Sequence, residues 1–415
     1  MRQKKIIQKR LEKKIEEEIS NTQAGFRKNC GTRDQLFNLK MIIQKCREYN
    51  VDLYMCFIDY SKAFDCVSHE KLWKVLNDMG FPKREIHLIK ELYRGQQSAV
   101  RTSCGTTEWF RVEKGVRQGC ILSPYLFNAY TEAIMRQVEE DGERGDFQEP
   151  NIQGHRIKDL RYADDTTLMS NSNNGLEKLT NSVKTHSEAY DLHLNVKKTK
   201  VMKTDKSEEK CCIKVNGETL EAVNKYEYLG STITENGDGI TEIKKRLAIA
   251  ADKLGKMKTL WKGQDARTKL RIIRACVFPT ATYGCETWTS NKTVSKIINA
   301  FEMKCYRRIL RVSWTEHRTN ESIRKELGVP EGWLENYVLK LKLKYFGHLK
   351  RHEGLGRTIL EGKMNGKRTR GRPRKQWEKE IQQALGMTVT EAGRMAKDRQ
   401  QYRKTIGGTT SRISG

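Results

Sequence analysis

The chain has 415 residues, long enough for two or three packed domains, and its 79 Lys and Arg outnumber its 52 Asp and Glu to give a formal net charge of +27 at pH 7. So large a positive charge favours a polyanionic partner, nucleic acid before an anionic membrane surface, although a basic protein without such a partner would share this composition. No apolar run approaches the roughly 18 residues of a membrane-spanning helix, and the basic N-terminus lacks the apolar stretch of a secretory signal, so we expect a protein of the nucleus or cytoplasm.

The first elements mix helices with a buried strand. An isoleucine or leucine stands at every fourth position from Ile7 to Ile19, which predicts a helix with one apolar face. Helical spacing continues through residues 33–48. Residues 53–59 (LYMCFID) then form a short apolar run, which predicts a strand that ends in an acid.

Further along, turn and cap residues mark the elements. Ser123 and Pro124 form an N-cap and N1 pair that predicts the start of another helix. Residues 161–169 (RYADDTTLM) have short apolar arms around two acids and predict a strand–turn–strand hairpin. Asn216-Gly217 is a strong signal for a second hairpin turn. Because strands and helices mix without strict βαβ alternation, we expect an α+β fold.

From about residue 241 the apolar spacing is almost wholly helical. The predicted helices cover residues 241–261, 266–278, 291–311, 319–327 and 333–349. After about residue 350 this spacing fades and basic residues dominate, so we expect residues 350–415 to form a basic tail with little core of its own.

The eleven cysteines lack CxxC spacing, and the chain is too long for a disulfide scaffold. Reduced, mostly buried thiols are the favoured interpretation. A zinc site formed by Cys276, Cys285, Cys305 and His317 is the alternative, although their spacing is irregular.

Three carboxylates are the candidate catalytic residues. Asp59 ends the apolar strand, while Asp164 and Asp165 occupy the predicted hairpin turn. On adjacent strands they would form a compact acidic cluster, which is costly unless cations neutralise it. Mg²⁺ suits such a site because it prefers hard oxygen ligands and keeps substrate phosphates in its shell. Any single one of these acids could instead be a solvated turn residue, and YADD by itself is a weak signal.

Four further motifs accompany YADD in a fixed order. They are FIDYSKAFD (57–65), GVRQGCILSPYLFN (115–128), LNVKKTK (194–200) and YEYLG (226–230), preceded by QAGFRKNCGTRDQL (23–36). With YADD as the third, this order resembles motifs A to E of reverse transcriptases, and the upstream element resembles that of non-LTR (LINE-type) retrotransposon enzymes. The resemblance spans roughly residues 10–235, with weaker similarity through the helical part.

The resemblance implies a role for each matching residue. It makes Asp59, Asp164 and Asp165 the catalytic acids that bind two Mg²⁺ ions, with Mn²⁺ as a possible substitute. Phe64 falls at the position of the aromatic steric gate, where a ring beneath the sugar would clash with a 2′-hydroxyl. A plain core phenylalanine is the alternative interpretation of Phe64.

The same resemblance assigns residues to the substrates. Gln118 and Gly119 match the pair that lies against the incoming nucleotide and template, and Arg27 is a candidate contact of the triphosphate. Lys198 aligns with the lysine proposed to protonate the leaving pyrophosphate, although Lys197 and Lys200 stand close enough to leave that assignment open.

Residues of the fifth motif and of the C-terminal part complete the implied site. Tyr228, Leu229 and Gly230 resemble the primer grip, a tight turn that holds the 3′ end of the primer. Arg370, Arg372 and Arg374 lie in RGRPRK, which resembles an AT-hook that enters a narrow minor groove. A charged disordered run or a nuclear-localisation patch is the alternative for this segment.

The implied fold is a right-hand polymerase. Residues 1–235 would be the fingers and palm, 236–349 a helical thumb-like region and 350–415 the basic tail. We expect incomplete fingers, because nothing in the sequence matches the first finger strand of the family. An upstream apurinic-type endonuclease domain is likewise not expected here.

The implied function is an RNA-directed DNA polymerase that uses an RNA template, a DNA primer and deoxynucleoside triphosphates, without a membrane partner. Two alternatives stay open: a catalytically silent nucleic-acid-binding remnant of a retrotransposon, and an RNA-dependent RNA polymerase. Phe64 and the upstream GFR triplet speak against the RNA polymerase.

Overall fold

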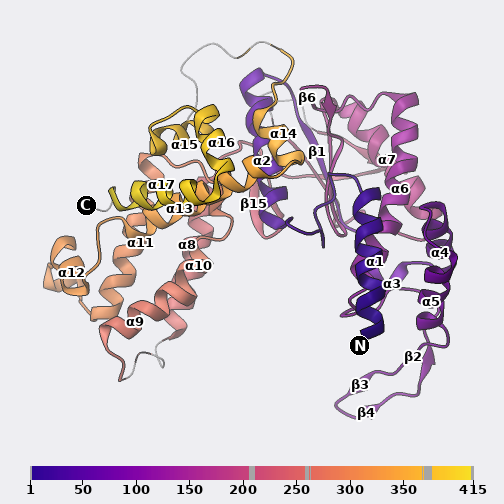
Figure 1. Cartoon of the computed structure of the whole chain (residues 1–415), viewed down its shortest axis with the longest axis horizontal. Coiled ribbons are helices and arrows are strands. Elements are labelled where there is room, and N and C mark those ends of the chain that lie inside the picture. Colours follow the sequence, from indigo (N-terminus) through magenta and orange to yellow (C-terminus); the bar gives the residue numbers. More distant parts are fainter. Residues whose placement is uncertain are drawn as a thin grey trace. The chain divides into compact units, whose positions relative to one another are not determined.

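The computed structural model describes residues 2–204, 211–257, 261, 263–366, 368 and 376–412. The chain divides into two compact units (Figure 1). Unit 1 comprises Met1–Gln35, Tyr49–Asn224 and Gly362–Lys367, and unit 2 comprises Leu36–Glu48, Lys225–Glu361 and Arg368–Gly415. Unit 1 combines a sheet with helices, and unit 2 is almost entirely helical, so the predicted α+β fold is confirmed.

Unit 1 is built around a five-stranded sheet. Its strand order is β13 (Glu221–Ala222), β10 (Lys200–Lys203), β1 (Tyr54–Ile58), β9 (Asp165–Ser170) and β8 (Asp159–Tyr162). Only the β10–β13 pair is parallel among these neighbours. All five residues of the central strand β1 are buried, as a continuous apolar run predicts for a strand covered on both faces.

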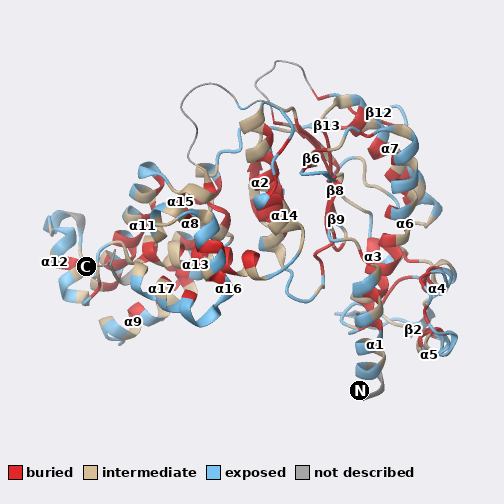
Figure 2. Ribbon diagram, turned by 45° about the horizontal axis from the view of Figure 1, so that its top comes forward, coloured by how far each residue is buried: buried red, intermediate tan, exposed pale blue. Residues whose placement is uncertain are grey.

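Helices pack against this sheet and against each other (Figure 2). They are α1 (Arg2–Glu18), α3 (Ala63–Cys66), α4 (His69–Asp78), α5 (Lys83–Tyr93), α6 (Ser123–Gly145) and α7 (Asn173–Ala189). Helix α7 contacts both β1 and β9, and α1 contacts α6 through its predicted apolar face.

The start of α6 differs from the sequence prediction, in which Ser123 is the N-cap residue of this helix. Leu122 holds the N-cap position, and the Ser123 hydroxyl donates instead to the Arg117 carbonyl at 2.5 Å.

Short hairpins complete unit 1. The pairs are β2 (Gln97–Ser98) with β5 (Phe110–Arg111), β3 (Arg101–Thr102) with β4 (Gly105–Thr106), β6 (Asn151–Ile152) with β7 (His155–Arg156) and β11 (Lys214–Val215) with β12 (Glu218–Thr219). The last pair confirms the turn predicted at Asn216-Gly217.

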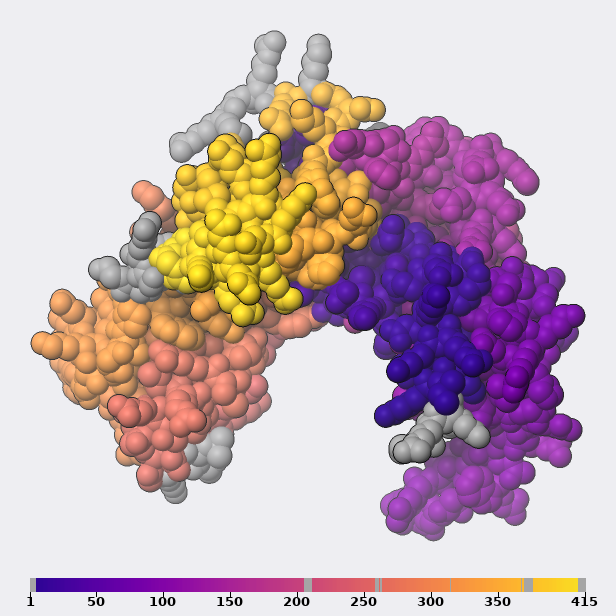
Figure 3. Space-filling view, in the orientation of Figure 1, coloured from indigo at the N-terminus to yellow at the C-terminus, as the bar shows by residue number. Residues whose placement is uncertain are grey.

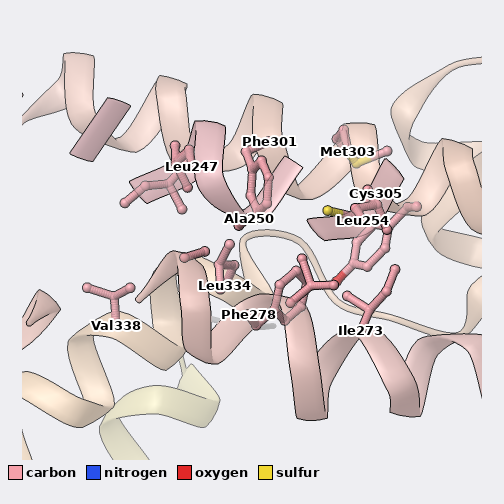
Figure 4. Packing of buried hydrophobic residues seen from close by; sticks show 14 of the residues in the cluster. Leu247, Ala250, Leu254, Ile273, Phe278, Phe301, Met303, Cys305, Leu334 and Val338 are labelled. Atoms are coloured by element: carbon pink, nitrogen blue, oxygen red, sulfur yellow. The ribbon is translucent and has the colours of Figure 1, made fainter. Parts of the chain in front are cut away.

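Unit 2 contains most of α2 (Thr32–Tyr49), one hairpin, and the C-terminal helices. The hairpin pairs β14 (Lys225–Tyr228) with β15 (Ser231–Thr234). The first helices are α8 (Ile240–Lys256), α9 (Ala266–Ile272), the π-helix η2 (Ile273–Val277), α10 (Phe278–Ala281), the 3₁₀-helix η3 (Cys285–Thr287), α11 (Lys292–Leu310), the 3₁₀-helix η4 (Trp314–Glu316), α12 (Asn320–Leu327) and α13 (Trp333–Arg351). They follow the helices predicted from spacing, and Leu254, Ile273 and Phe278 lie in their shared core (Figure 4).

The segment after residue 350 differs from the expected tail. It folds into α14 (Leu355–Glu361), α15 (Trp377–Leu385), α16 (Val389–Lys397) and α17 (Arg399–Arg412). Trp377, Ile381 and Tyr402 are buried, and α16 and α17 both pack on α13, as Figure 3 shows for the yellow C-terminal helices on the orange ones. The prediction of little core was wrong, because each short helix carries few apolar residues and buries them against other elements of unit 2. Trp377 contacts Phe37 of α2 and Phe346 of α13, and α15 packs on α16 and α17. Arg370, Arg372 and Arg374 lie outside the described residues.

Within the described part of the chain, no helix is long and apolar enough to cross a membrane.

Candidate active site at the end of the central strand

The sheet brings the first candidate acid beside the hairpin that carries the other two. Ile58, the last residue of β1, has Thr166 of β9 as its partner in the antiparallel ladder. Asp59 directly follows Ile58 and Asp165 directly precedes Thr166, so both acids flank the last pair of this ladder. Asp164 lies in the two-residue turn that joins β8 to β9, because Tyr162 pairs with Asp165.

That turn has an unusual backbone. Ala163, its first residue, has a φ of 59°, in the left-handed region that costs a residue with a Cβ about 1–2 kcal/mol. A positive φ at the first loop residue only is the pattern of a type II′ turn, which usually takes glycine there. The surrounding structure must therefore hold Ala163 in this conformation.

The acids at this turn are electrostatically uncompensated. The pKa of Asp165 is raised to about 6. The largest cause is that the surrounding protein removes part of the hydration of its carboxylate, and the negative charges of Asp164 and Asp59 raise the pKa further. Burial also raises the pKa of Asp164, with a further contribution from Asp59. A cluster of carboxylates that destabilise one another's charged forms is suited to binding a cation.

Among the residues that the structure describes, no group of three or more His, Cys, Asp and Glu side chains forms a preformed metal cage. This holds for the alternative zinc site at Cys276 as well as for the three acids. Mg²⁺ seldom needs such a cage, since it commonly binds one or two carboxylates together with water and substrate phosphates. Asp59 and Asp165, which flank the last pair of the β1–β9 ladder, fit that mode of binding.

Phe64 lies in the short helix α3, five residues after Asp59. Its ring stacks on Phe127 of α6 with centroids 4.3 Å apart and meets Phe26 edge-on at 6.4 Å. The side chain is only partly buried. Phe64 is thus held by two aromatic neighbours and remains partly accessible, as a steric gate requires.

The loop that bears Gln118 and Gly119 is tied to the segment of Phe64. The backbone N–H of Val116 donates to the Phe64 carbonyl at 2.8 Å, and that of Gly115 donates to Val67 at 2.7 Å. Gln118 and Gly119 themselves form an exposed turn just before α6. An exposed turn anchored beside Phe64 leaves both residues accessible to a nucleotide.

Arg27 makes contacts that hold its own loop. Its guanidinium pairs with Glu16 at 2.7 Å and donates to the carbonyls of Ser20 and Gln23 at 2.8 and 3.1 Å. The side chain is only 10% exposed. These contacts favour a structural role over contact with a triphosphate.

The three candidate lysines differ in their partners. The Lys200 ammonium pairs with Glu221 at 2.6 Å and donates to the Lys197 carbonyl. Lys198 is exposed and follows a turn in which its backbone N–H donates to Asn195. An ammonium already held by a carboxylate is less available for proton transfer, so the contacts favour Lys198 or Lys197 over Lys200.

The candidate primer grip is a separate hairpin turn, in unit 2. Leu229 and Gly230 form the two-residue loop between Tyr228 and Ser231, with φ values of 46° and 72°. Positive φ at both positions defines a type I′ turn, which glycine favours at the second position. The Tyr283 hydroxyl donates to the Leu229 carbonyl at 3.0 Å, so a side chain far along the chain supports this turn.

A chain of contacts continues behind Tyr283. The Arg246 guanidinium lies 4.4 Å from the Tyr283 ring centroid and donates to Glu242 at 2.7 Å. Glu242 also accepts from the backbone N–H of Thr232 in β15 at 2.7 Å. Helix α8 thereby contacts β15 close to the turn and, through Arg246, the Tyr283 ring that supports the turn.

The sequence of this chain matches a known protein family over more than half of its length. The family described as "Reverse transcriptase (RNA-dependent DNA polymerase)" matches residues 2–233. A transposon-derived protein of Caenorhabditis elegans is 28% identical over 63% of this chain and 99% of its own length. The Pol polyprotein of retrotransposable element R2DM of Drosophila melanogaster is 24% identical over 52% of this chain and 21% of its own length.

A third relative extends the match toward the C-terminus. The RNA-directed DNA polymerase from mobile element jockey of Drosophila funebris is 22% identical over 80% of this chain and 36% of its own length. The chain thus spans nearly all of the nematode relative and a minor part of both retrotransposon proteins. Among solved structures, telomerase from Candida albicans with a telomeric RNA fragment has a TM-score of 0.49 at 11% identity, covering 77% of this chain and 57% of that chain.

Proposed function

Because the chain belongs to the reverse transcriptase family, we propose that it is an RNA-directed DNA polymerase, which extends the 3′-hydroxyl of a DNA primer along an RNA template. The observation that supports this proposal is the register of β1 and β9, in which Asp59 follows and Asp165 precedes the last ladder pair, next to the turn that contains Asp164. The printed names of the R2DM and jockey relatives support a retrotransposon origin. A template and primer of these kinds would be met in the nucleus or the cytoplasm.

Each proposed catalytic residue has a chemical task. Asp59, Asp164 and Asp165 would hold two Mg²⁺ ions, which supply activation of the primer 3′-hydroxyl and charge stabilisation at the transferred phosphate. The 3′-oxygen forms a bond to the α-phosphorus while the bond to pyrophosphate breaks. Lys198 would donate a proton to the leaving pyrophosphate.

Substrate selection would fall to residues around Phe64. Its ring, stacked on Phe127, is rigid enough to exclude a 2′-hydroxyl and so to select deoxynucleotides. Gln118 and Gly119 would lie against the incoming nucleotide, and the turn at Tyr228, Leu229 and Gly230 would hold the primer. We leave Arg27 out of the proposed site because Glu16 and two loop carbonyls already engage its guanidinium.

Primer extension on an RNA template with Mg²⁺ tests the proposal. We expect deoxynucleotide incorporation by the full chain and a loss of at least a hundredfold in Asp165→Asn, because one carboxylate ligand is removed. The matched control is Asp78→Asn, which neutralises an exposed acid of α4 and should leave the rate unchanged. Template binding without any incorporation would identify the silent nucleic-acid-binding alternative. Preferential incorporation of ribonucleotides would identify an RNA-dependent RNA polymerase instead.

A further inference from the structure

The side chain of Gln23 forms hydrogen bonds with the turn between β8 and β9, next to the candidate acids. It is 1% exposed, and its Oε1 accepts from the backbone N–H groups of Gly25 at 2.8 Å and Ala163 at 3.0 Å. Its Nε2 donates a hydrogen bond to the Ala163 carbonyl at 3.4 Å. One carboxamide therefore meets both backbone polar groups of the left-handed residue in the turn. The two N–H donors fix the orientation of the amide, since the flipped group would turn N–H against N–H.

Gly25 allows the backbone of this segment to lie directly on the turn. A Cβ at Gly25 would stand 2.2 Å from the Ala163 nitrogen and 2.9 Å from the Tyr162 carbonyl carbon. Both are backbone atoms that cannot move aside without shifting the hairpin. The Asn128 amide on α6 also donates to the Gly25 carbonyl at 2.8 Å. Gly25 is thus held between α6 and the turn.

The same segment closes the edge of the sheet. Residues 22–24 run along β8, where the Arg161 N–H donates to Thr22 and the Ala24 N–H donates to Arg161, both at 2.9 Å. The Gln35 amide donates to the Arg161 carbonyl at 2.8 Å. These contacts fix residues 22–25 relative to β8, so that the Gln23 side chain meets the turn as part of a rigid support.

We propose that Gln23 is a positioning residue that holds the Ala163–Asp164 turn in its left-handed conformation and thereby keeps Asp164 and Asp165 beside Asp59. Gly25 supports it by close backbone contact. Without the carboxamide, the N–H of Ala163 would lose its acceptor in a buried place, and the turn would relax toward conformations that suit alanine. The catalytic consequence rests on the proposed polymerase function, whereas the structural consequence does not.

Gln23→Met tests the proposal, since methionine has a similar length and volume but lacks the amide. The control is Gln8→Met, which removes a part-buried glutamine of α1 that contacts Tyr125. Hydrogen–deuterium exchange of peptides spanning residues 160–166 is the first readout. We expect exchange about tenfold faster in Gln23→Met, as loss of a buried hydrogen bond predicts, and no change in Gln8→Met.

Calorimetric titration of the full chain with Mn²⁺, without nucleic acid, is the second readout. We expect binding to weaken several-fold in Gln23→Met, because acids that are no longer held together share a cation less well. In primer extension, kcat should fall while KM for the deoxynucleotide changes less than twofold. A purely structural role would instead lower the melting temperature and reduce the active fraction at unchanged Mn²⁺ affinity.

A second substitution keeps the test decisive if Gln23→Met folds poorly. Ala163→Gly accepts the positive φ without strain, so the effect of Gln23→Met should shrink when Ala163→Gly is present. Unchanged exchange and Mn²⁺ affinity in folded Gln23→Met, or equal effects in the two backgrounds, would overturn the proposal. If the chain proves inactive as a polymerase, exchange and Mn²⁺ binding still decide this inference, so the two failures are distinguishable.

Discussion

Arg161 is a buried cation in the β8–β9 hairpin that carries two of the candidate acids. Its side chain is 2% exposed and pairs with Glu132 at 2.8 Å and with Asp159 at 2.7 Å, whose side chains are 6% and 4% exposed. Arg161→Met would leave two carboxylates buried without their cation, and breaking a buried pair in this way usually costs about 3–5 kcal/mol. The Ser20 N–H and the Thr22 hydroxyl still donate to these carboxylates, so we expect the lower end of that range.

Urea unfolding of the full chain measures this cost. With a slope of roughly 2 kcal/mol per molar urea, a loss of about 3 kcal/mol lowers the midpoint by roughly 1.5 M. Arg136→Met is the control, because its pair with Glu18 is 43% and 25% exposed and should contribute less than about 1 kcal/mol.

Neutralising the whole cluster separates buried charge from lost packing. Arg161→Met combined with Glu132→Gln and Asp159→Asn removes every charge, and we expect it to recover part of the lost stability. If Arg161→Met shifted the midpoint no more than Arg136→Met does, the reasoning from burial would be refuted. The same conclusion would follow if neutralising both acids made the protein still less stable.

Three further predictions concern the substrates. Phe64→Val should raise ribonucleotide incorporation in competition assays while deoxynucleotide use persists, because the ring stacked on Phe127 is the proposed barrier to a 2′-hydroxyl; unchanged selectivity would make Phe64 a core residue only. Tyr283→Phe removes the hydroxyl that supports the Leu229 carbonyl, and we expect KM for the primer to rise several-fold at unchanged template affinity, measured by steady-state extension. Replacing Arg370, Arg372 and Arg374 together by alanine should weaken nucleic-acid binding and lower the slope of log affinity against log salt by up to about 3, measured by fluorescence anisotropy; an equal slope would exclude contact by this segment. Truncation at residue 350 would not isolate the effect of these three arginines, because it also removes the buried side chains of Trp377 and Tyr402.

The parts of the fold that depend on local pattern were predictable. The continuous apolar run that forms β1 and the spacing of the helices from α8 to α13 carry their structure in neighbouring residues. The C-terminal helices could not be predicted in this way, since α15 and α16 have nine residues each and are buried by contacts with distant elements such as α2 and α13. In so short a segment, tertiary contacts determine the structure more strongly than helix propensity does.

In the candidate site, too, residues within short motifs could be predicted, whereas contacts between distant residues could not. Asp59, Asp164 and Asp165 could be proposed from the sequence because each lies in a motif of adjacent residues. The contact of Gln23 with Ala163 could not be predicted, because the two residues lie 140 positions apart. The pair of Arg161 with Glu132 joins a strand to a helix 29 positions earlier, and no motif links the two residues. Asp159 and Arg161 alternate on a strand as exposed residues commonly do, and nothing in the sequence marks them as a buried pair.

The support of the acids therefore lies largely outside the motif that contains them. Ala163 and Asp164 form the turn, but Gln23, Gly25 and Asn128 hold it, and they come from the loop before α2 and from α6. A chain could keep YADD unchanged and still lose the site through a substitution at Gln23 or Gly25. Since mutually repelling carboxylates gain nothing from closeness until a cation binds, this rigid support must exist beforehand. We therefore expect the proposed catalysis to need both the acidic motif and the residues that hold its turn.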